Sequence, residues 1–263
     1  MARIAIDASL DAVVEFDKVS MRMPRRKRRR GSGRRQRLKR IAGESRRDEI
    51  DVLTDVSFRI EPGESVLLIG SKNSARQALL RLAAGTLRPD SGSIRRNQPI
   101  MPMIEVARSF LRTYSIRQNI YVVGGLLGMT PSQVESHLPW IAENAGVDGI
   151  LDRFLGAAPA SVRQKLAWSI VMCVEAKAYA IDRTLVVGES SFKEQCWQHV
   201  DKLRAEGATF LIASDSPRQF IRFCDRAIYL DDGRVVVDST VPEAIEALRK
   251  DRQVARDSGS DSA

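Results

Sequence analysis

The chain of 263 residues has few cysteines and histidines, and they are widely separated. Cys173, Cys196 and Cys224 are odd in number and have apolar neighbours, which indicates buried, reduced thiols rather than a disulfide framework or a metal site. The two histidines, His137 and His199, have no pattern of metal ligands near them. We therefore expect neither zinc nor haem.

Long apolar segments are also missing. No run approaches the roughly 20 apolar residues that cross a bilayer, and residues 1–10 lack the charged-then-apolar order of a signal peptide. These absences predict a chain that stays in the cytosol. The length and the hydrophobic fraction of 43% suffice for one large α/β domain with a full core, or for two small ones.

Positive charge is concentrated in one segment, Arg25 to Arg40, which holds eleven Lys or Arg and no acid. Removing these eleven charges from the formal +9 leaves −2 for the remainder of the chain. A run of like charges with Gly and Ser cannot bury itself, so a solvated loop is the first interpretation. Attraction to anionic inner-leaflet lipid or to an acidic polymer is the second. Nucleic acid ranks last, because no aromatic residue interleaves the charges.

Hydrophobic periodicity divides the rest of the chain into strands and helices. The expected strands cover residues 12–19, 51–60, 65–70, the end of 87–94, 178–187, 209–214, 226–230 and 234–238. The expected helices cover residues 76–85, 109–127, 131–145, 162–176, 192–206, 217–224 and 242–250. Their alternation in the last third predicts a parallel sheet covered on both faces. The polar tail from residue 251 is expected to fray.

Several stretches, in order along the chain, resemble the ATP-binding subunits of ABC exporters of capsular polysaccharide, O-antigen and teichoic acid. The stretches are LIG (68–70), ALLRLAAG (78–85) and LRPDSGSI (87–94) for the phosphate-loop region, LAWS (166–169) for the helix after the signature, Asp182 with LVVGE (185–189) and FKEQC (192–196) for the Walker B region, and CDRAIYLDDGR (224–234) for the closing hairpin. Their common order is more specific than any one motif.

The resemblance implies an α/β fold, the ABC nucleotide-binding domain, with a P-loop NTPase-like core, an antiparallel β subdomain and a helical subdomain. We expect one domain over residues 1–250, with a basic loop insertion at 24–48, a helical subdomain at 103–177 and a polar tail at 251–263. Two apolar strands, 65–70 and 178–182, each need cover on two faces and should lie in one sheet.

The phosphate loop departs from the family pattern G-x-x-x-x-G-K-[ST]. The candidate nucleotide-binding residues in this register are Gly70, Ser71, Lys72, Asn73, Ser74, Ala75, Arg76 and Gln77. Ala75 replaces a glycine, Arg76 replaces the lysine with a planar fork, and Gln77 replaces the magnesium-binding hydroxyl. Two interpretations stay open for Arg76 and Lys72, which either bind an anion or are solvated cations at a helix start.

The catalytic positions that the resemblance implies are also altered. Asp182 is the candidate magnesium ligand, or else a strand-end carboxylate that caps the next turn. Arg183 stands at the position of the glutamate that polarises water, and a cation cannot accept a proton. Asp215 stands at the switch histidine. Residues 158–162 replace the Ser-Gly signature, and Pro159 removes a backbone donor. No catalytic residue is expected intact, and binding of ATP and Mg²⁺ is expected to be weak.

Two functions follow as expectations. In the first, the chain is an ATP-binding-type subunit of a polysaccharide exporter, with weak or no ATP hydrolysis. It would lie at the inner face of the plasma membrane and pair with a permease and with itself or an active homologue. In the second, it is a non-enzymatic regulator or scaffold that kept the fold. Trp140, Trp168 and Trp197 are expected to be core or interface residues rather than sugar platforms.

Overall fold

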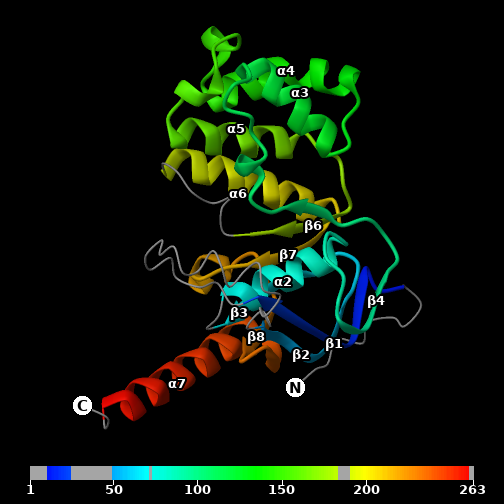
Figure 1. The fold of residues 1–263 in the computed structure, drawn as a ribbon, viewed down its shortest axis with the longest axis vertical. Helices are drawn as coiled ribbons and strands as arrows, with labels where there is room; N and C mark the ends of the chain where they lie inside the picture. The colour runs from blue at the N-terminus through cyan, green and yellow to red at the C-terminus, as the bar shows by residue number, and fades with distance from the viewer. Residues whose placement is uncertain (1–10, 25–48, 71–72, 183–189, 261–263) are drawn as a thin grey trace, which may run out of the picture.

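The computed structural model describes residues 11–24, 49–70, 73–182 and 190–260. The chain forms two sheets and a layer of helices, and the last helix projects from the body (Figure 1). Almost all of the predicted basic insertion at 24–48 lies outside the described residues. Within the described part of the chain, no helix is both long and apolar enough to span a bilayer.

The smaller sheet is antiparallel and has the order β2-β1-β4. It consists of β1 (Val14–Pro24), β2 (Glu49–Ile60) and β4 (Ser91–Arg96). One face of β1 and β2 is apolar, and the rings of Phe16 and Phe58 stack with their centroids 4.5 Å apart. An antiparallel strand group in the N-terminal third is therefore confirmed.

The larger sheet has the order β5-β6-β7-β3-β8-β9 and is parallel except for β9. Its strands are β3 (Ser65–Gly70), β5 (Met101–Met103), β6 (Ala178–Ile181), β7 (Thr209–Ala213), β8 (Arg226–Asp231) and β9 (Arg234–Thr240). Every residue of β3, β6 and β7 is buried, as expected for parallel strands that are covered on both faces. The predicted strands 65–70 and 178–182 do share one sheet.

Each face of this sheet has its own cover. Leu68 and Ala180 point to the face that packs against α2 (Asn73–Ala83) and the smaller sheet. Leu67 and Tyr179 point to the opposite face, where α6 (Ser190–Ala205) and the helical layer pack. The alternation of side chains along each strand thus divides the core into two clusters.

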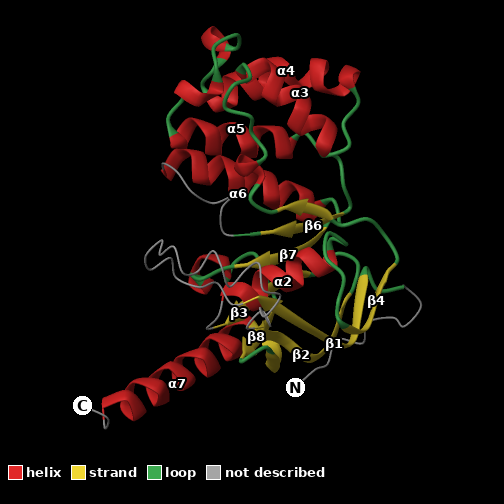
Figure 2. Cartoon of the chain, viewed as in Figure 1, coloured by secondary structure: helices red, strands yellow, loops and turns green. Residues whose placement is uncertain are grey.

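The helical layer contains α3 (Ile116–Leu126), α4 (Pro131–Ala145) and α5 (Ala160–Met172), and it stands over one side of the larger sheet (Figure 2). Helix α4 has the predicted bounds. Helix α3 begins at Ile116 and not at residue 109, because the side chains of Ser115 and Gln118 form a capping box there.

The C-terminal elements correct two predictions. The helix expected at 217–224 is only a 3-10 turn, η5 (Pro217–Phe220), and α7 runs over Val241–Ser260, well beyond the predicted end at 250. The hydroxyl of Tyr229 donates a hydrogen bond of 2.8 Å to Asp251 and holds the helix to β8 beyond that point. The tail predicted to fray is helical up to Ser260.

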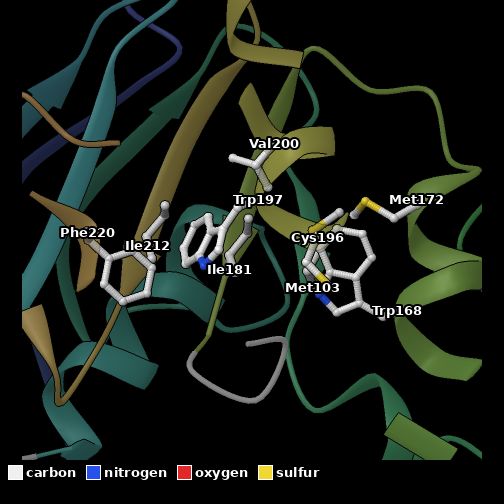
Figure 3. A pocket seen from close by; sticks show the side chains of 9 residues that line it. All are labelled: Met103, Trp168, Met172, Ile181, Cys196, Trp197, Val200, Ile212 and Phe220. Carbon is white, nitrogen blue, oxygen red and sulfur yellow. The ribbon is translucent and has the colours of Figure 1, made fainter. Parts of the chain in front are cut away.

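Two tryptophans and two of the three cysteines, Cys196 and Cys224, lie inside the molecule, whereas Cys173 is partly buried. Trp168 and Trp197 are buried and line an apolar cavity of about 10 Å³ with Cys196, which leaves barely the space of one water (Figure 3). These two side chains are core residues, as predicted, whereas Trp140 is 45% exposed. All three cysteines are free, and burial raises the pKa of each thiol to about 12.

Candidate functional site

The candidate loop follows the central strand of the larger sheet. Strand β3 ends at Gly70, and α2 begins three residues later at Asn73. Ser71, Lys72 and the side chains of Asn73 and Ser74 lie outside the described part. Ala75 lies within α2 and is buried in the core, and Gln77 is partly exposed.

Gly70 has a packing role of its own. It pairs with Leu230 of the parallel neighbour β8, and a Cβ at position 70 would collide with the carbonyl oxygen of Leu230. A backbone oxygen cannot move aside as a flexible side chain can. The one glycine kept from the loop pattern is therefore required by the sheet, whether or not a phosphate binds.

We expect Gly70→Ala to lower the free energy of unfolding by about 2 kcal/mol, because the sheet must shift to admit the methyl group. Urea unfolding measures the loss, and the loss should be the same with and without millimolar ATP. Gly125 is the control, since a Cβ there meets no atom within 4 Å. Equal stability of Gly70→Ala and wild type would contradict the packing role.

Arg76 lies in the first turns of α2 and is only 2% exposed. Its Nη1 donates to the carbonyl oxygen of Gly70, and its Nη2 forms an ion pair with the carboxylate of Asp215. The side chain of Asp215 is 38% exposed. Arg76 is therefore not a solvated cation at a helix start, and that interpretation is excluded.

The topology explains how two residues 139 positions apart meet. Arg76 follows β3 and Asp215 follows β7, and these strands are parallel neighbours. The carboxyl ends of parallel strands lie at the same edge of a sheet, where open α/β folds place their ligands. Ser214 N donates to Leu68 O over 3.2 Å, which ties the end of β7 to β3 at this edge.

Asp182 follows β6 at the same edge and is buried. Arg183 lies outside the described residues. Over the ranges that the structure describes, no group of three or more His, Cys, Asp and Glu side chains could hold a metal ion. A carboxylate contacts Arg76, and an amide stands at position 77, whereas the G-x-x-x-x-G-K-[ST] pattern has a lysine and a hydroxyl at positions 76 and 77.

The start of α5 is the second region that the resemblance singles out. Pro159 is its N-cap and provides no side-chain hydrogen bond, and the Arg163 guanidinium donates to the carbonyl oxygen of Ala158. A proline offers no N–H, and no serine or glycine stands at this helix start before Ser161. This helix end presents fewer donors to an anion than a Ser-Gly start would.

Sequence reasoning singled out Arg76 and Asp215 separately and missed their contact. The available signal was the opposite charge of the two residues, at positions that both follow strands of a parallel sheet. Strand order within the sheet cannot be read from the sequence, so the pairing of β3 with β7 was needed to bring the two side chains together.

The chain resembles several curated proteins and solved structures. No family model matches the chain. ABC transporter protein AbcA of Aeromonas salmonicida is 28% identical over 193 residues, which cover 73% of this chain and 62% of that protein. The O-antigen export system ATP-binding protein RfbB of Klebsiella pneumoniae is 27% identical over 198 residues, 75% of this chain and 80% of that protein. The chain thus spans less than two thirds of the Aeromonas protein.

Among solved structures, the ATP-binding subunit of an ABC transporter superposes with a TM-score of 0.67 at 19% identity, over 90% of this chain and 94% of the other. At that identity the likeness concerns the fold, and it confirms the predicted one. The chain has the fold of an ABC nucleotide-binding domain, and the curated proteins that it resembles include an ABC transporter protein and an O-antigen export system ATP-binding protein.

Proposed function

We propose that this chain is an ABC-type subunit associated with export of a capsular or other cell-surface polysaccharide, and that it does not hydrolyse ATP. The resemblance to RfbB, which carries the words O-antigen export in its name, supports the transport role. The observation that carries the loss of hydrolysis is the ion pair between the buried guanidinium of Arg76 and the carboxylate of Asp215, which is 38% exposed.

The partners proposed are an integral-membrane permease and a second ABC subunit, either another copy or an active homologue. The chain would then sit at the inner face of the plasma membrane. Contact of the 25–40 basic run with anionic lipid would strengthen that attachment. We also propose that residues 1–250 form one domain with a helical subdomain at 103–177, and that α7 carries the chain past this boundary into the polar tail.

A second function, regulator or scaffold, has one observation in its favour. In a mixed dimer, the partner's phosphate loop would face the start of α5, where Pro159 removes a donor. A site shared with an intact partner would therefore also be impaired. The impaired shared site argues against a heterodimer that hydrolyses ATP, but it leaves the resemblance to exporter proteins unchanged.

The purified chain should release phosphate from ATP no faster than buffer. Arg183 cannot accept a proton from the attacking water, and Asp215, which is paired with Arg76, does not restore the role of the switch histidine. Proton transfer alone contributes about 10²- to 10⁴-fold to a rate. Asp182→Asn is the control, and the wild type should be as slow as this variant. Turnover abolished by Asp182→Asn would show that the site is active.

The same chain, tagged and recovered from membranes, should bring down a polysaccharide permease together with an ATPase. Recovery of soluble partners alone would reject transport in favour of the regulator. Recovery of the permease tests the transport role, and the phosphate-release assay tests the absence of ATP hydrolysis.

A further inference from the structure

A groove edged by arginines lies between η5 and α7. The turn η5 packs against α7, the helix that projects from the body toward the C-terminus (Figure 1). The groove has a volume of about 440 Å³, which lies within the range of ligand-binding clefts. Residues 216–219 form one wall, and Ile245, Leu248, Arg249 and Arg252 of α7 form the other.

The wall that α7 provides is one face of the helix. Its four residues stand at positions i, i+3, i+4 and i+7, so the groove follows the helix for about two turns, or roughly 10 Å. Ile245 is 7% exposed and Leu248 is 4% exposed, whereas Arg249 and Arg252 are exposed. The groove therefore has an apolar floor and charged edges.

The positive charge of the groove has no counter-charge in the described part of the chain. Among the described residues, no carboxylate forms an ion pair with Arg218, Arg249 or Arg252, and no Asp or Glu lines the groove. Arg249 and Arg252 are three residues apart on one helix, a spacing at which like charges repel each other. An anion in the groove would relieve this repulsion.

The acids next to the groove have other partners. On α7, Glu246 pairs with Lys250 over 2.8 Å, and Asp251 accepts a hydrogen bond from the hydroxyl of Tyr229. Asp215, which precedes the opposite wall, takes part in the ion pair with the start of α2 described above. A counter-charge for the three arginines therefore has to come from a ligand.

We propose that this groove binds an acidic peptide segment of a partner protein, with an aliphatic side chain on the apolar floor and carboxylates on the arginines. Guanidinium groups bind carboxylates through two parallel donors. Arginines spread over two helical turns suit carboxylates spread along a chain better than one compact anion. The proposal applies equally to an exporter subunit and to a regulator.

The lining favours a peptide over other polyanions. No aromatic side chain is among the described residues that line the groove, whereas single-stranded nucleic acid is held by stacking on aromatic rings. The apolar residues lie at the bottom of a hollow and are at most 7% exposed, so the flat surface of a bilayer would not reach them. An acidic polysaccharide carries carboxylates but has no aliphatic side chain to occupy the floor.

The test is fluorescence anisotropy of the full chain with a fluorescein-labelled peptide of repeated Glu-Leu-Asp units. A peptide of repeated Glu-Ser-Asp units has the same charge and measures the contribution of charge alone, including that of the basic run at 25–40. The leucine peptide should bind about tenfold more tightly, because leucine gains apolar contact on the floor. Equal affinity for the two peptides would overturn the proposal.

Variants at exposed positions locate the binding. Arg249→Gln and Arg252→Gln should each weaken binding of the leucine peptide about three- to tenfold, as expected for charged contacts near solvent. Arg88→Gln is the matched control, because Arg88 is also exposed but does not line the groove, and it should bind like the wild type. Gln219→Trp fills the groove without changing its charge and should remove the preference for leucine.

Other occupants of the groove would give different results. Sedimentation tests for a second copy, and vesicles of phosphatidylglycerol test for lipid. The proposal is overturned if Arg249→Gln abolishes self-association or vesicle binding while peptide binding is unchanged, or if Arg88→Gln weakens peptide binding as much as the groove variants do. Recovery of the permease and the phosphate-release assay do not involve the peptide, so the proposed function and this proposal can fail separately.

Discussion

Asp215→Ala is expected to lower the free energy of unfolding by about 2 to 3 kcal/mol. Removing one partner of a buried ion pair costs about 3 to 5 kcal/mol, because the remaining buried charge loses part of its compensation. The loss expected here is smaller, about 2 to 3 kcal/mol, because the side chain of Asp215 is 38% exposed and water can enter the space that it leaves. Urea unfolding followed by circular dichroism measures the loss.

The control is the same substitution in a chain that carries Arg76→Met. Methionine removes the buried charge while filling most of the space, so Asp215→Ala should then cost less than about 0.5 kcal/mol. Equal costs in the two backgrounds would mean that the ion pair contributes no coupling. Asp225→Ala should change stability by less than about 0.5 kcal/mol, as expected for an exposed residue.

Trp197→Ala should have a still larger effect, a loss of about 3 to 5 kcal/mol. The indole stacks on Phe223 with ring centroids 4.0 Å apart and meets the edge of Phe220 at 5.1 Å. It also borders the apolar cavity in Figure 3, so the deletion would enlarge that cavity, and the stability lost grows with cavity volume. Thermal and urea unfolding both report the change.

Trp140→Ala is the matched control for this deletion. Trp140 lies on α4 and is 45% exposed, so its removal should cost less than about 1 kcal/mol. Similar losses at positions 140 and 197 would contradict the division between surface and core tryptophans described above.

Local signals in the sequence predicted some elements to the residue. Strand β3 was predictable because six residues of mainly apolar character follow a Pro-Gly turn. Helix α4 was predictable because Thr130 and Pro131 mark its start, and Gly146, with a φ of 68°, marks its end. At these positions, local preference and tertiary structure agree.

Other elements depended on the tertiary structure. Strand β5 has only three residues, one of them Pro102, and it exists because β6 pairs with it. Helix α3 was predicted too long because Phe110 is buried before the helix begins, which extended the apolar pattern beyond the cap at Ser115.

The candidate site was predictable residue by residue but not as an arrangement. The sequence alone identified Arg76 and Asp215 as departures from the family pattern. Whether they contact each other depends on strand order, rotamer and burial, none of which periodicity encodes. The same limit explains why a solvated Arg76 stayed open as an interpretation until its burial was known.

One feature of the core bears on how the molecule opens. A single apolar cluster includes Leu67 and Tyr179 from the sheet and Ile120, Ile141 and Ile170 from the helical layer. Swinging the helices away as a rigid lid would expose this shared interior to water at roughly 25 cal/mol for each Å². Local opening there is therefore costly, and the amide hydrogens of α5 should be among the slowest to exchange with solvent.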